Sequence, residues 1–257
     1  MRFFILIFLT ISFVTLSCGG KRAGETTKEK RLSDQKTLAL ASLLRKNFQQ
    51  ALVDIQDAED MDDDDPEVYN IKGLIYFALK EYAEAEKSYK EAIEIKSDYS
   101  EARYNLCGLY LTLAQWDKAI DECSKAGSDV RYRSRDKAFT SLGVAYFRKG
   151  DFDKAKENYL KSLEINPALV YTHNELGKLY MSTGNEEEAI EEFRKAINGY
   201  NMYDEAYYNL GLAYLKIGKT DNACASFKKV TEISPDSIFG VNARSYLTSL
   251  CKGKETL

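Results

Sequence analysis

The sequence predicts an all-α fold, a right-handed superhelical solenoid of six helical hairpins followed by a C-terminal cap helix. The first observation is a recurring small residue, with successive steps of 34, 34, 36, 34 and 34 residues, at Ala51, Ala85, Ala119, Ala155, Ala189 and Ala223. The second is that apolar residues recur at helical spacing on both sides of each of these alanines. A period of this size indicates stacked copies of one supersecondary unit, which share a continuous core.

The predicted unit is a pair of amphipathic helices that pack face to face. Gly211 and Tyr214 lie on the apolar stripe of the first helix, and Ala223 and Phe227 lie on that of the second. The small residues Gly211 and Ala223 allow the helices to come closer than the usual separation of about 8 to 10 Å. Gly218 stands where the first helix must end, a position suited to a left-handed C-terminal cap.

The landmarks Leu-Gly, Tyr, Ala and Phe at a 34-residue period resemble the tetratricopeptide repeat, or TPR. The positions equivalent to the glycine are Ala39, Gly73, Cys107, Gly143, Gly177 and Gly211, and those equivalent to the tyrosine are Ser42, Tyr76, Tyr110, Tyr146, Tyr180 and Tyr214. We expect six repeats over residues 32–237, with approximate bounds 32–65, 66–99, 100–135, 136–169, 170–203 and 204–237. Residues 238–251 have the pattern of a solvating cap helix, and residues 252–257 are expected to be a disordered tail.

The first residues have the pattern of an export signal. Arg2 precedes an apolar run, Phe3 to Val14, which is too short for an ordinary membrane-spanning helix. The run leads to Cys18 in a segment that resembles a bacterial lipobox, although Thr15 stands where Leu is usual. We therefore expect residues 1–17 to be a lipoprotein signal peptide and Cys18 to carry covalent lipid. The alternative is that Cys18 belongs to an ordinary cleavage region.

The lipobox resemblance also implies a location. In such lipoproteins of diderm bacteria an Asp after the cysteine favours the inner membrane, and Gly19 stands there instead. This implies a lipid anchor on the periplasmic face of the outer membrane. Residues 18–31 are polar and lack an apolar stripe, so we expect the lipidated N-terminus to continue as a flexible tether.

The composition argues against several classes of function. The net charge of −4, with no basic face, argues against a nucleic-acid partner. His173 is the single histidine, expected to be a packed core residue, and no Gly-rich phosphate loop or Ser-His-Asp set can be assembled. The acidic run Glu59 to Asp65 lacks the calcium-loop pattern. We expect no enzyme, no catalytic residue, no metal, no small-molecule substrate and no cofactor apart from lipid on Cys18.

Four further cysteines, an even number, suit an oxidising compartment. Cys107 and Cys123 occupy the glycine and phenylalanine positions of one hairpin, so both side chains are expected in the same interface. A disulfide there is one hypothesis, and two buried thiols are the alternative. A disulfide between Cys224 and Cys251 would join the last repeat to the cap helix.

The TPR resemblance implies a binding groove lined by the first helix of each repeat. Residues one, four or five positions after the glycine, together with two tyrosines, are expected to face it: Leu40, Leu43, Leu74, Phe77, Tyr104, Leu111, Val144, Phe147, Met181, Tyr208, Leu212 and Leu215. These residues are mostly apolar, which favours an extended or helical hydrophobic segment as the ligand. The alternative is that they cover one another or contact the tether. The Lys and Asn residues by which chaperone-adaptor TPR domains hold a carboxylate are absent at the matching places.

A signal with a lipobox, six repeats and a cap helix together resemble the type IV pilus pilotins of the PilF/PilW and Tgl kind. A local feature agrees: Tyr132 and Arg135 belong to the segment 131–135, which contains a two-residue insertion and precedes Phe139, Leu142 and Gly143. The segments 153–159 and 161–163 also look like the fourth repeat of that family. The resemblance implies an outer-membrane lipoprotein that binds secretin subunits and promotes their assembly. Two alternatives remain, a generic TPR lipoprotein of envelope assembly or polysaccharide export and an accessory subunit of an envelope enzyme.

Overall fold

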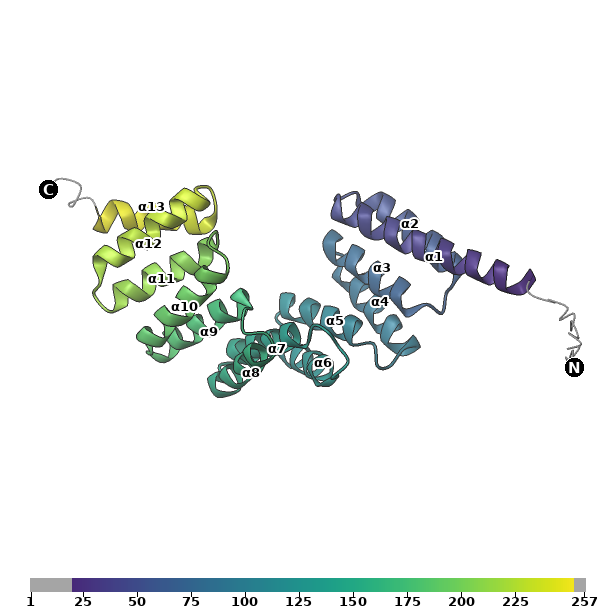
Figure 1. Cartoon of the computed structure of the whole chain (residues 1–257), viewed down its shortest axis with the longest axis horizontal. Helices are drawn as coiled ribbons and strands as arrows, with labels where there is room; N and C mark the ends of the chain where they lie inside the picture. Colours follow the sequence, from purple (N-terminus) through teal and green to yellow (C-terminus); the bar gives the residue numbers. More distant parts are fainter. Residues whose placement is uncertain (1–19, 252–257) are drawn as a thin grey trace, which may run out of the picture. The chain divides into compact units, whose positions relative to one another are not determined.

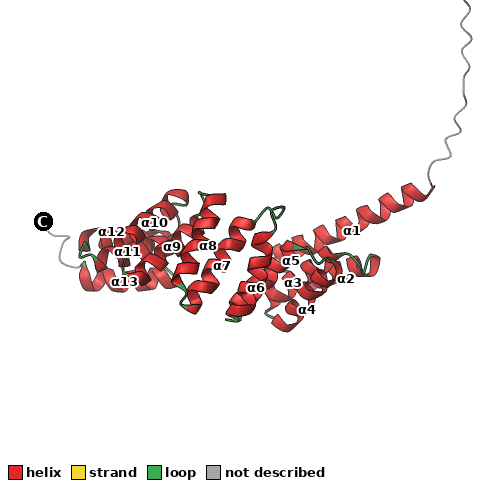
Figure 2. Ribbon diagram, turned by 90° about the horizontal axis from the view of Figure 1, so that it is seen from below, coloured by secondary structure: helices red, strands yellow, loops and turns green. Residues whose placement is uncertain are grey.

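A computed structural model describes residues 20–251, which form thirteen α-helices and no strand (Figures 1 and 2). The chain divides into two compact units, residues 1–64 and 65–257. The first unit contains α1 (Gly20–Leu44) and α2 (Phe48–Met61). The second contains α3 (Pro66–Leu79), α4 (Tyr82–Ile95), α5 (Ser100–Thr112), α6 (Trp116–Ser128), α7 (Arg135–Lys149), α8 (Phe152–Ile165), α9 (Val170–Thr183), α10 (Glu186–Gly199), α11 (Asp204–Lys216), α12 (Thr220–Ile233) and α13 (Ile238–Leu250). The predicted all-α TPR solenoid is confirmed.

The first unit corrects the expected tether. Helix α1 begins at Gly20, so residues 20–31 are helical and do not form a flexible leash. Helix propensity supplies the reason, because Lys, Arg, Glu and Ala dominate this segment and extend a helix even without an apolar stripe. Leu32 and Ala39 of α1 are buried, and Ala39 is fully so. Leu38 of the same helix is 52% exposed.

Close packing of four of the five hairpins in the second unit depends on a glycine beneath an aromatic ring. A Cβ atom added at Gly177 would lie 2.5 Å from the ring of Phe193, and one at Gly143 would lie 2.6 Å from Tyr159. Gly73 and Gly211 meet Tyr89 and Phe227 in the same way. Because no side chain fits between glycine and ring, the two helices of a hairpin come into close contact. The Gly-aromatic spacing in the sequence therefore sets the hairpin geometry.

The turns inside the hairpins require a left-handed residue. Gly150, Gly184 and Gly218 have φ values of 81°, 75° and 74°. In the hairpins of α3–α4 and α5–α6 the same place holds Lys80 and Ala114, with φ values of 65° and 55°. A residue with a Cβ is strained in this region and glycine is not, so these two turns are less favourable than the glycine turns.

The first helices of the hairpins form one row. Helix α3 contacts α5, α5 contacts α7, and the series continues through α9 and α11 to α13. The second helices α4, α6, α8, α10 and α12 do not contact one another. The repeats of the second unit therefore curve, with the first helices on the inner side (Figure 1). We call this side the inner row.

Polar side chains join successive helices of the inner row. The amide of Asn105 donates to Asn70 at 2.8 Å, and that of Asn209 donates to Asn174 at 3.0 Å. Each pair links the first helices of adjacent repeats. Between them Thr140 and Thr172 share a buried hydrogen bond of 2.6 Å. These contacts satisfy polar groups that would otherwise be buried without partners, and they fix the register of the stack.

Helix α13 closes the second unit. Ser237 caps its first turn and also donates to Asp204 of α11 at 3.0 Å. The ring of Tyr246 stacks on Phe227 with 4.7 Å between centroids. Residues 238–250 are therefore a helix packed on the last repeat. None of the helices in the described part of the chain has the length and hydropathy needed to span a membrane.

Candidate partner-binding surface

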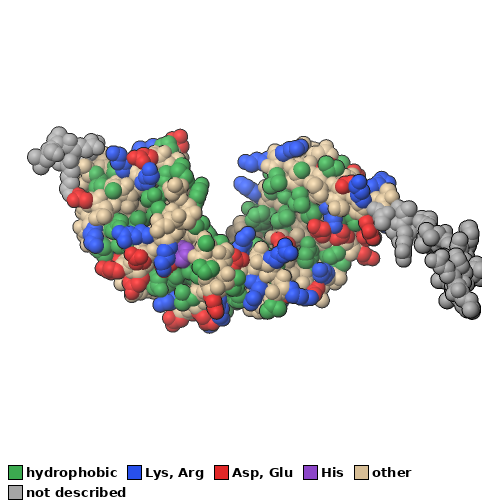
Figure 3. Space-filling view, viewed as in Figure 1, with side chains coloured by type: hydrophobic (Ala, Val, Ile, Leu, Met, Phe, Trp, Pro, Cys, Tyr) green, Lys and Arg blue, Asp and Glu red, His purple; other side chains and the backbone are tan. Residues whose placement is uncertain are grey.

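The twelve residues predicted for the groove all lie on first helices of hairpins and are all partly buried. Leu40 and Leu43 lie on α1 in the first unit. The other ten lie on the inner row of the second unit. On the face shown in Figure 3, hydrophobic side chains gather along the inner side of α9 and α11, with charged side chains between them. The sequence spacing therefore predicts positions on the inner row correctly. Contacts with neighbouring elements decide which of these side chains are accessible to a partner.

Two predicted tyrosines are covered by other parts of the fold. The ring of Tyr208 contacts Phe239 and Tyr246 of α13, with centroids 5.5 and 6.3 Å away, because the cap helix packs over it. The ring of Tyr104 lies 6.2 Å from Tyr132 in the loop between α6 and α7. Each tyrosine ring therefore takes part in packing against another element, the cap helix for Tyr208 and the loop between α6 and α7 for Tyr104.

The remaining apolar side chains of the inner row form what we call the apolar strip: Leu74, Phe77, Leu111, Val144, Phe147, Met181, Leu212 and Leu215. Each packs by one side against a buried core cluster and keeps another side partly accessible. The ring of Phe147 also meets that of Phe152 across the hairpin turn, with 5.6 Å between centroids. The side chains of the strip are therefore held in place by the core, which lowers the entropic cost of binding a partner.

A charged group interrupts the strip at α9, and the sequence analysis did not single it out. The ammonium group of Lys178 lies 2.7 Å from the carboxylate of Glu175 and 3.2 Å from that of Glu205. Lys178 occupies the place one residue after Gly177, the same rule that selected Leu74, Val144 and Leu212. The predicted groove contains only apolar residues and tyrosines, so it leaves out Lys178, although the same spacing rule points to this position.

Burial affects the pKa values of both Glu175 and Lys178. Glu175 is only 4% exposed, and its burial raises the pKa of its carboxyl group, an effect that Lys178 opposes. Burial lowers the pKa of Lys178, but the charge and hydrogen bond of Glu175 outweigh burial, so its pKa is raised. The two groups stabilise each other's charged forms.

The single histidine has a structural place in the same repeat. His173 is 8% exposed, as expected for a core residue. Its Nδ1 lies 2.5 Å from the carboxylate of Glu192, and its Nε2 lies 2.9 Å from the carbonyl oxygen of Pro167. A carboxylate and a carbonyl oxygen both accept hydrogen bonds, so these partners favour the protonated ring, which donates from both nitrogens. The hydrogen bonds outweigh the effect of burial and raise the pKa of His173.

The four cysteines expected to pair do so in the structure. Cys107 of α5 is bonded to Cys123 of α6, with 5.4 Å between Cα atoms. Cys224 of α12 is bonded to Cys251, directly after α13, with 6.1 Å between Cα atoms. The first bond closes one hairpin, and the second fastens the cap helix to the last repeat.

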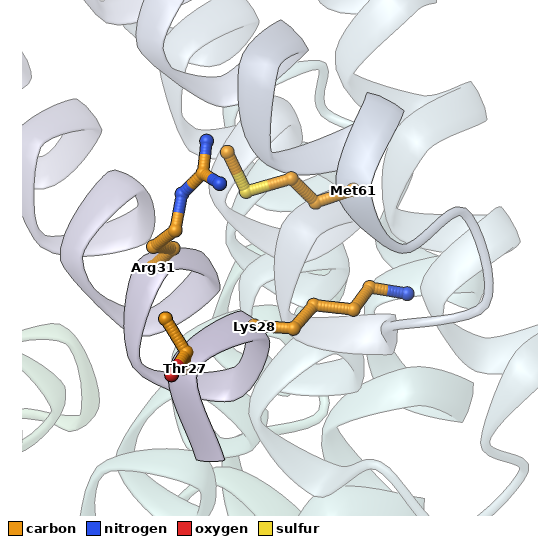
Figure 4. Close-up of a pocket in the computed structure, with 4 residues that line it drawn as sticks. All are labelled: Thr27, Lys28, Arg31 and Met61. Atoms are coloured by element: carbon orange, nitrogen blue, oxygen red, sulfur yellow. The ribbon is translucent and has the colours of Figure 1, made fainter. Parts of the chain in front are cut away.

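Two features of the first unit lie apart from the strip. A pocket of about 360 Å³ is lined by Thr27, Lys28 and Arg31 of α1 and by Met61 of α2, whose side chain reaches toward Arg31 (Figure 4). The expected signal peptide, the lipidated Cys18 and the C-terminal tail lie outside the described residues. Across residues 20–251 no group of three or more His, Cys, Asp and Glu side chains is arranged to hold a metal ion.

Three family models of the tetratricopeptide repeat match parts of the chain. A TPR repeat model matches residues 143–184 and 177–218, and two tetratricopeptide repeat models match residues 204–237 and 66–99. All three describe repeats, and they indicate no catalytic family.

Type IV pilus proteins are among the similar proteins. Type IV pilus assembly protein PilF of Pseudomonas aeruginosa is 25% identical over 129 residues, which cover 50% of this chain and 51% of that protein. The solved structure of P. aeruginosa PilF has a TM-score of 0.75 at 18% identity and covers 85% of this chain and 99% of its own. That of PilW, a type IV pilus biogenesis factor, has a TM-score of 0.76 at 21% identity and covers 83% and 98%.

The matched segments span between 12% and 51% of the length of the curated relatives. The structural likeness to PilF and PilW therefore shows the fold, and the repeat models show which segments carry the repeat. Together with the hairpins and the inner row, these matches show that the chain is a tetratricopeptide-repeat protein.

Proposed function

We propose that this chain is a non-enzymatic scaffold that binds a protein partner along the apolar strip of the inner row. The observation that carries the proposal is the strip itself, where eight apolar side chains on successive first helices are held by the core and left partly accessible. A contiguous apolar surface of this kind marks an interaction site. An extended or helical hydrophobic segment fits it, because such segments present apolar side chains at regular intervals.

The partner in this proposal is a secretin subunit, and the process is type IV pilus biogenesis. The similarity to PilF over half of the chain and the fold shared with PilF and PilW support this choice. The insertion with Tyr132 and Arg135 supports it further, because it resembles the same feature in pilotins.

We further propose that lipid on Cys18 holds the chain at the periplasmic face of the outer membrane. Each buried methylene of an acyl chain contributes about 0.8 kcal/mol, so more than one chain gives stable anchoring. An anchored scaffold raises the local concentration of the subunits that it binds, which favours their assembly at the membrane. The two disulfides support an extracytoplasmic location, because such bonds persist in oxidising compartments.

Photo-crosslinking tests the partner. A photoreactive residue in place of Leu111, in the middle of the strip, is compared with one in place of Leu160, which is 47% exposed on α8. We expect ultraviolet irradiation of cells to link the secretin to position 111 and not to position 160. Equal linkage at both positions, or secretin absent from both, would contradict the proposal.

Two other functions use the same surface. A generic role in envelope assembly or polysaccharide export predicts crosslinks to a different envelope protein and genes without a pilus cluster nearby. An accessory role predicts copurification with an envelope hydrolase or synthase.

A further inference from the structure

One first helix of the inner row lacks a side chain where its neighbours contribute to the apolar strip. The place one residue after the glycine position holds Leu74 on α3 and Val144 on α7. Helix α5 lies between these two helices in the row (Figure 1), and the same place on it holds Gly108. The strip is therefore interrupted on α5 by an empty place, which we call the Gly108 gap.

Neither packing nor backbone conformation requires a glycine at this place. A Cβ atom added at Gly108 would meet no neighbouring atom within 4 Å, whereas one added at Gly143 or Gly177 would collide with an aromatic ring. Gly108 is partly buried and has a helical backbone inside α5, where glycine makes a helix less stable than alanine does. Among the glycines within α3 to α13 it is the one whose added Cβ would enter open space. The fold itself therefore supplies no reason for this glycine.

The Gly108 gap lies over the helical turn that carries Tyr104. A side chain on a helix covers the turn that precedes its own Cα, so a side chain at position 108 would cover Tyr104 and Asn105. The ring of Tyr104 is partly buried, and Tyr132 packs against it with 6.2 Å between centroids. The amide of Asn105 donates to Asn70 of α3. The gap is therefore bounded by an aromatic ring that is held in place and still partly accessible.

The side chains around Gly108 on α5 carry no charge. Leu111 and Thr112 follow it by three and four residues on the same helix face, and the Thr112 hydroxyl donates to the carbonyl oxygen of Gly108 at 2.9 Å. A charged side chain of a partner would lose its water here without gaining an opposite charge, whereas an apolar one would gain free energy by leaving water. The ring of Tyr104 favours an aromatic side chain, because aromatic pairs are attracted in offset and edge-to-face arrangements.

We propose that the Gly108 gap receives one aromatic side chain, Phe or Trp, from the apolar segment of the partner, which packs on Tyr104 between Leu74 and Val144. The proposal rests on the proposed function of the strip and specifies the residue that the strip selects. Aromatic residues that fill a desolvated place near the centre of an interface carry much of the binding energy. Apolar segments without an aromatic residue leave the gap unfilled and bind more weakly.

Selection from a random library of 12-residue peptides displayed on phage tests the Gly108 gap and requires no assumed ligand sequence. The bait is the purified full chain, with its folding checked by circular dichroism. We expect the selected peptides to share one Phe or Trp among other apolar residues. Replacing that residue by Ala in a synthetic peptide should weaken binding at least about tenfold, as measured by fluorescence anisotropy.

Three variants show whether the aromatic residue occupies the place of the missing side chain. Gly108→Leu supplies the residue type found at this place on α3 and α11, and it should weaken binding of the aromatic peptide at least about tenfold. The Ala peptide should bind Gly108→Leu no more weakly than it binds the wild type, because the new side chain fills the space that the peptide leaves empty. Gly108→Ala should weaken the aromatic peptide less. Ala225→Leu, at an exposed place on α12, is the control and should change neither peptide.

Thermal unfolding tests the premise that the space at Gly108 is open. Gly108→Ala should raise the midpoint of unfolding by about 2 to 4 °C, because alanine favours the helix and the added methyl group meets no neighbour. The variant should therefore be more stable than the wild type and yet bind the aromatic peptide more weakly. A lower midpoint would show that the added methyl group is not accommodated, which overturns the gap.

The outcomes separate this inference from the proposed function. Selected peptides without a shared aromatic residue, or equal binding of the aromatic peptide by the wild type and Gly108→Leu, overturn the Gly108 gap as a binding place and leave the apolar strip intact. Failure to select any peptide, with the chain folded, overturns both. If Gly108→Leu does not fold, the folded Gly108→Ala variant decides, and an unchanged affinity for the aromatic peptide overturns the inference.

Discussion

Cys107 and Cys123 form a disulfide at the place where other hairpins put a glycine against an aromatic ring. In the hairpin of α9 and α10 these positions are Gly177 and Phe193, which fill the space between the helices by close contact. In the hairpin of α5 and α6 the bulky ring is absent, so there is room for a side chain at the glycine position. A covalent bond replaces the packing of a ring.

Removal of this disulfide should destabilise the array. Cys107→Ala with Cys123→Ala should lower the free energy of unfolding by about 2 to 4 kcal/mol, the usual effect of a disulfide. The double variant Cys107→Gly with Cys123→Phe restores the pair found in α9 and α10, and should recover part of the loss. Urea unfolding followed by circular dichroism measures both. Equal stability of the alanine variant and the wild type would show that the thiols are unlinked, as would non-reduced peptides without a 107–123 link in mass spectrometry.

A charged side chain in the centre of the apolar strip should prevent binding of the partner. Phe147→Lys places an ammonium group beside Val144 and Arg148, so partner capture and secretin assembly should be lost while helicity is kept. The long lysine stem can extend toward solvent, which limits the effect on folding. Leu160→Lys, on an exposed site of α8, is the matched control. Heat-stable secretin multimers on gels give the readout, and normal multimers in the Phe147→Lys strain would refute the binding surface.

Anchoring should be separable from binding. Cys18→Ser removes the lipid acceptor, so the chain should leave the membrane fraction and the secretin should assemble at the wrong place. Capture of the partner in solution should be unchanged, because the strip lies elsewhere. Membrane fractionation and labelling with radioactive palmitate check this. A Cys18→Ser variant that stays with the outer membrane would count against lipidation.

Stability should depend on pH through His173. Its folded pKa is raised above the ordinary value of 6.5, so its stabilising effect is complete below pH 6.5 and is lost as pH rises through the folded pKa. The folded pKa of Glu192 is lowered from 4.5, despite burial, by the hydrogen bonds of His173 and Lys195, so its contribution is lost as pH falls through that lowered value. The pair therefore stabilises most between about pH 4.5 and 6.5.

Comparison with His173→Gln isolates this effect. Urea unfolding at pH 5.5 and pH 8.5 should show a larger stability difference between wild type and variant at pH 5.5, because the stabilising effect of the charged ring is complete there and declines as pH rises through the folded pKa. Lys195 faces the same carboxylate in wild type and variant, so it does not produce the difference. A gap between the two proteins that is the same at both pH values would mean that the ring does not titrate in this range.

One strained turn offers a stabilising change. Ala114 has a φ of 55°. Replacing it by Gly should stabilise the protein, because glycine adopts this conformation without steric cost. We expect Ala114→Gly to raise the free energy of unfolding by about 0.5 to 1 kcal/mol after the entropy of glycine is deducted. Ala225→Gly, the same change at an exposed place in the interior of α12, should lower stability by about 1 kcal/mol. Thermal unfolding of both variants gives the signs, and a destabilised Ala114→Gly variant would contradict the account.

The repeat, the fold class and the inner row follow from the amino-acid sequence alone. These features depend on short-range rules, because Gly73, Gly143 and Gly211 each need an aromatic partner at a fixed distance along the chain. The pairing of Cys107 with Cys123 could be proposed for the same reason, since it lies inside one hairpin. The flexible tether expected over residues 18–31 was wrong from residue 20 on, because residues with high helix propensity extend α1 to Gly20.

Contacts between repeats depend on the folded arrangement and were not predictable from the pattern. Tyr208 is covered because α13 folds over it, and Lys178 finds partners on two helices, Glu175 and Glu205. Periodicity predicts which face of a helix is apolar, but burial and charge pairing between residues about 30 positions apart depend on how far each repeat rotates against the next.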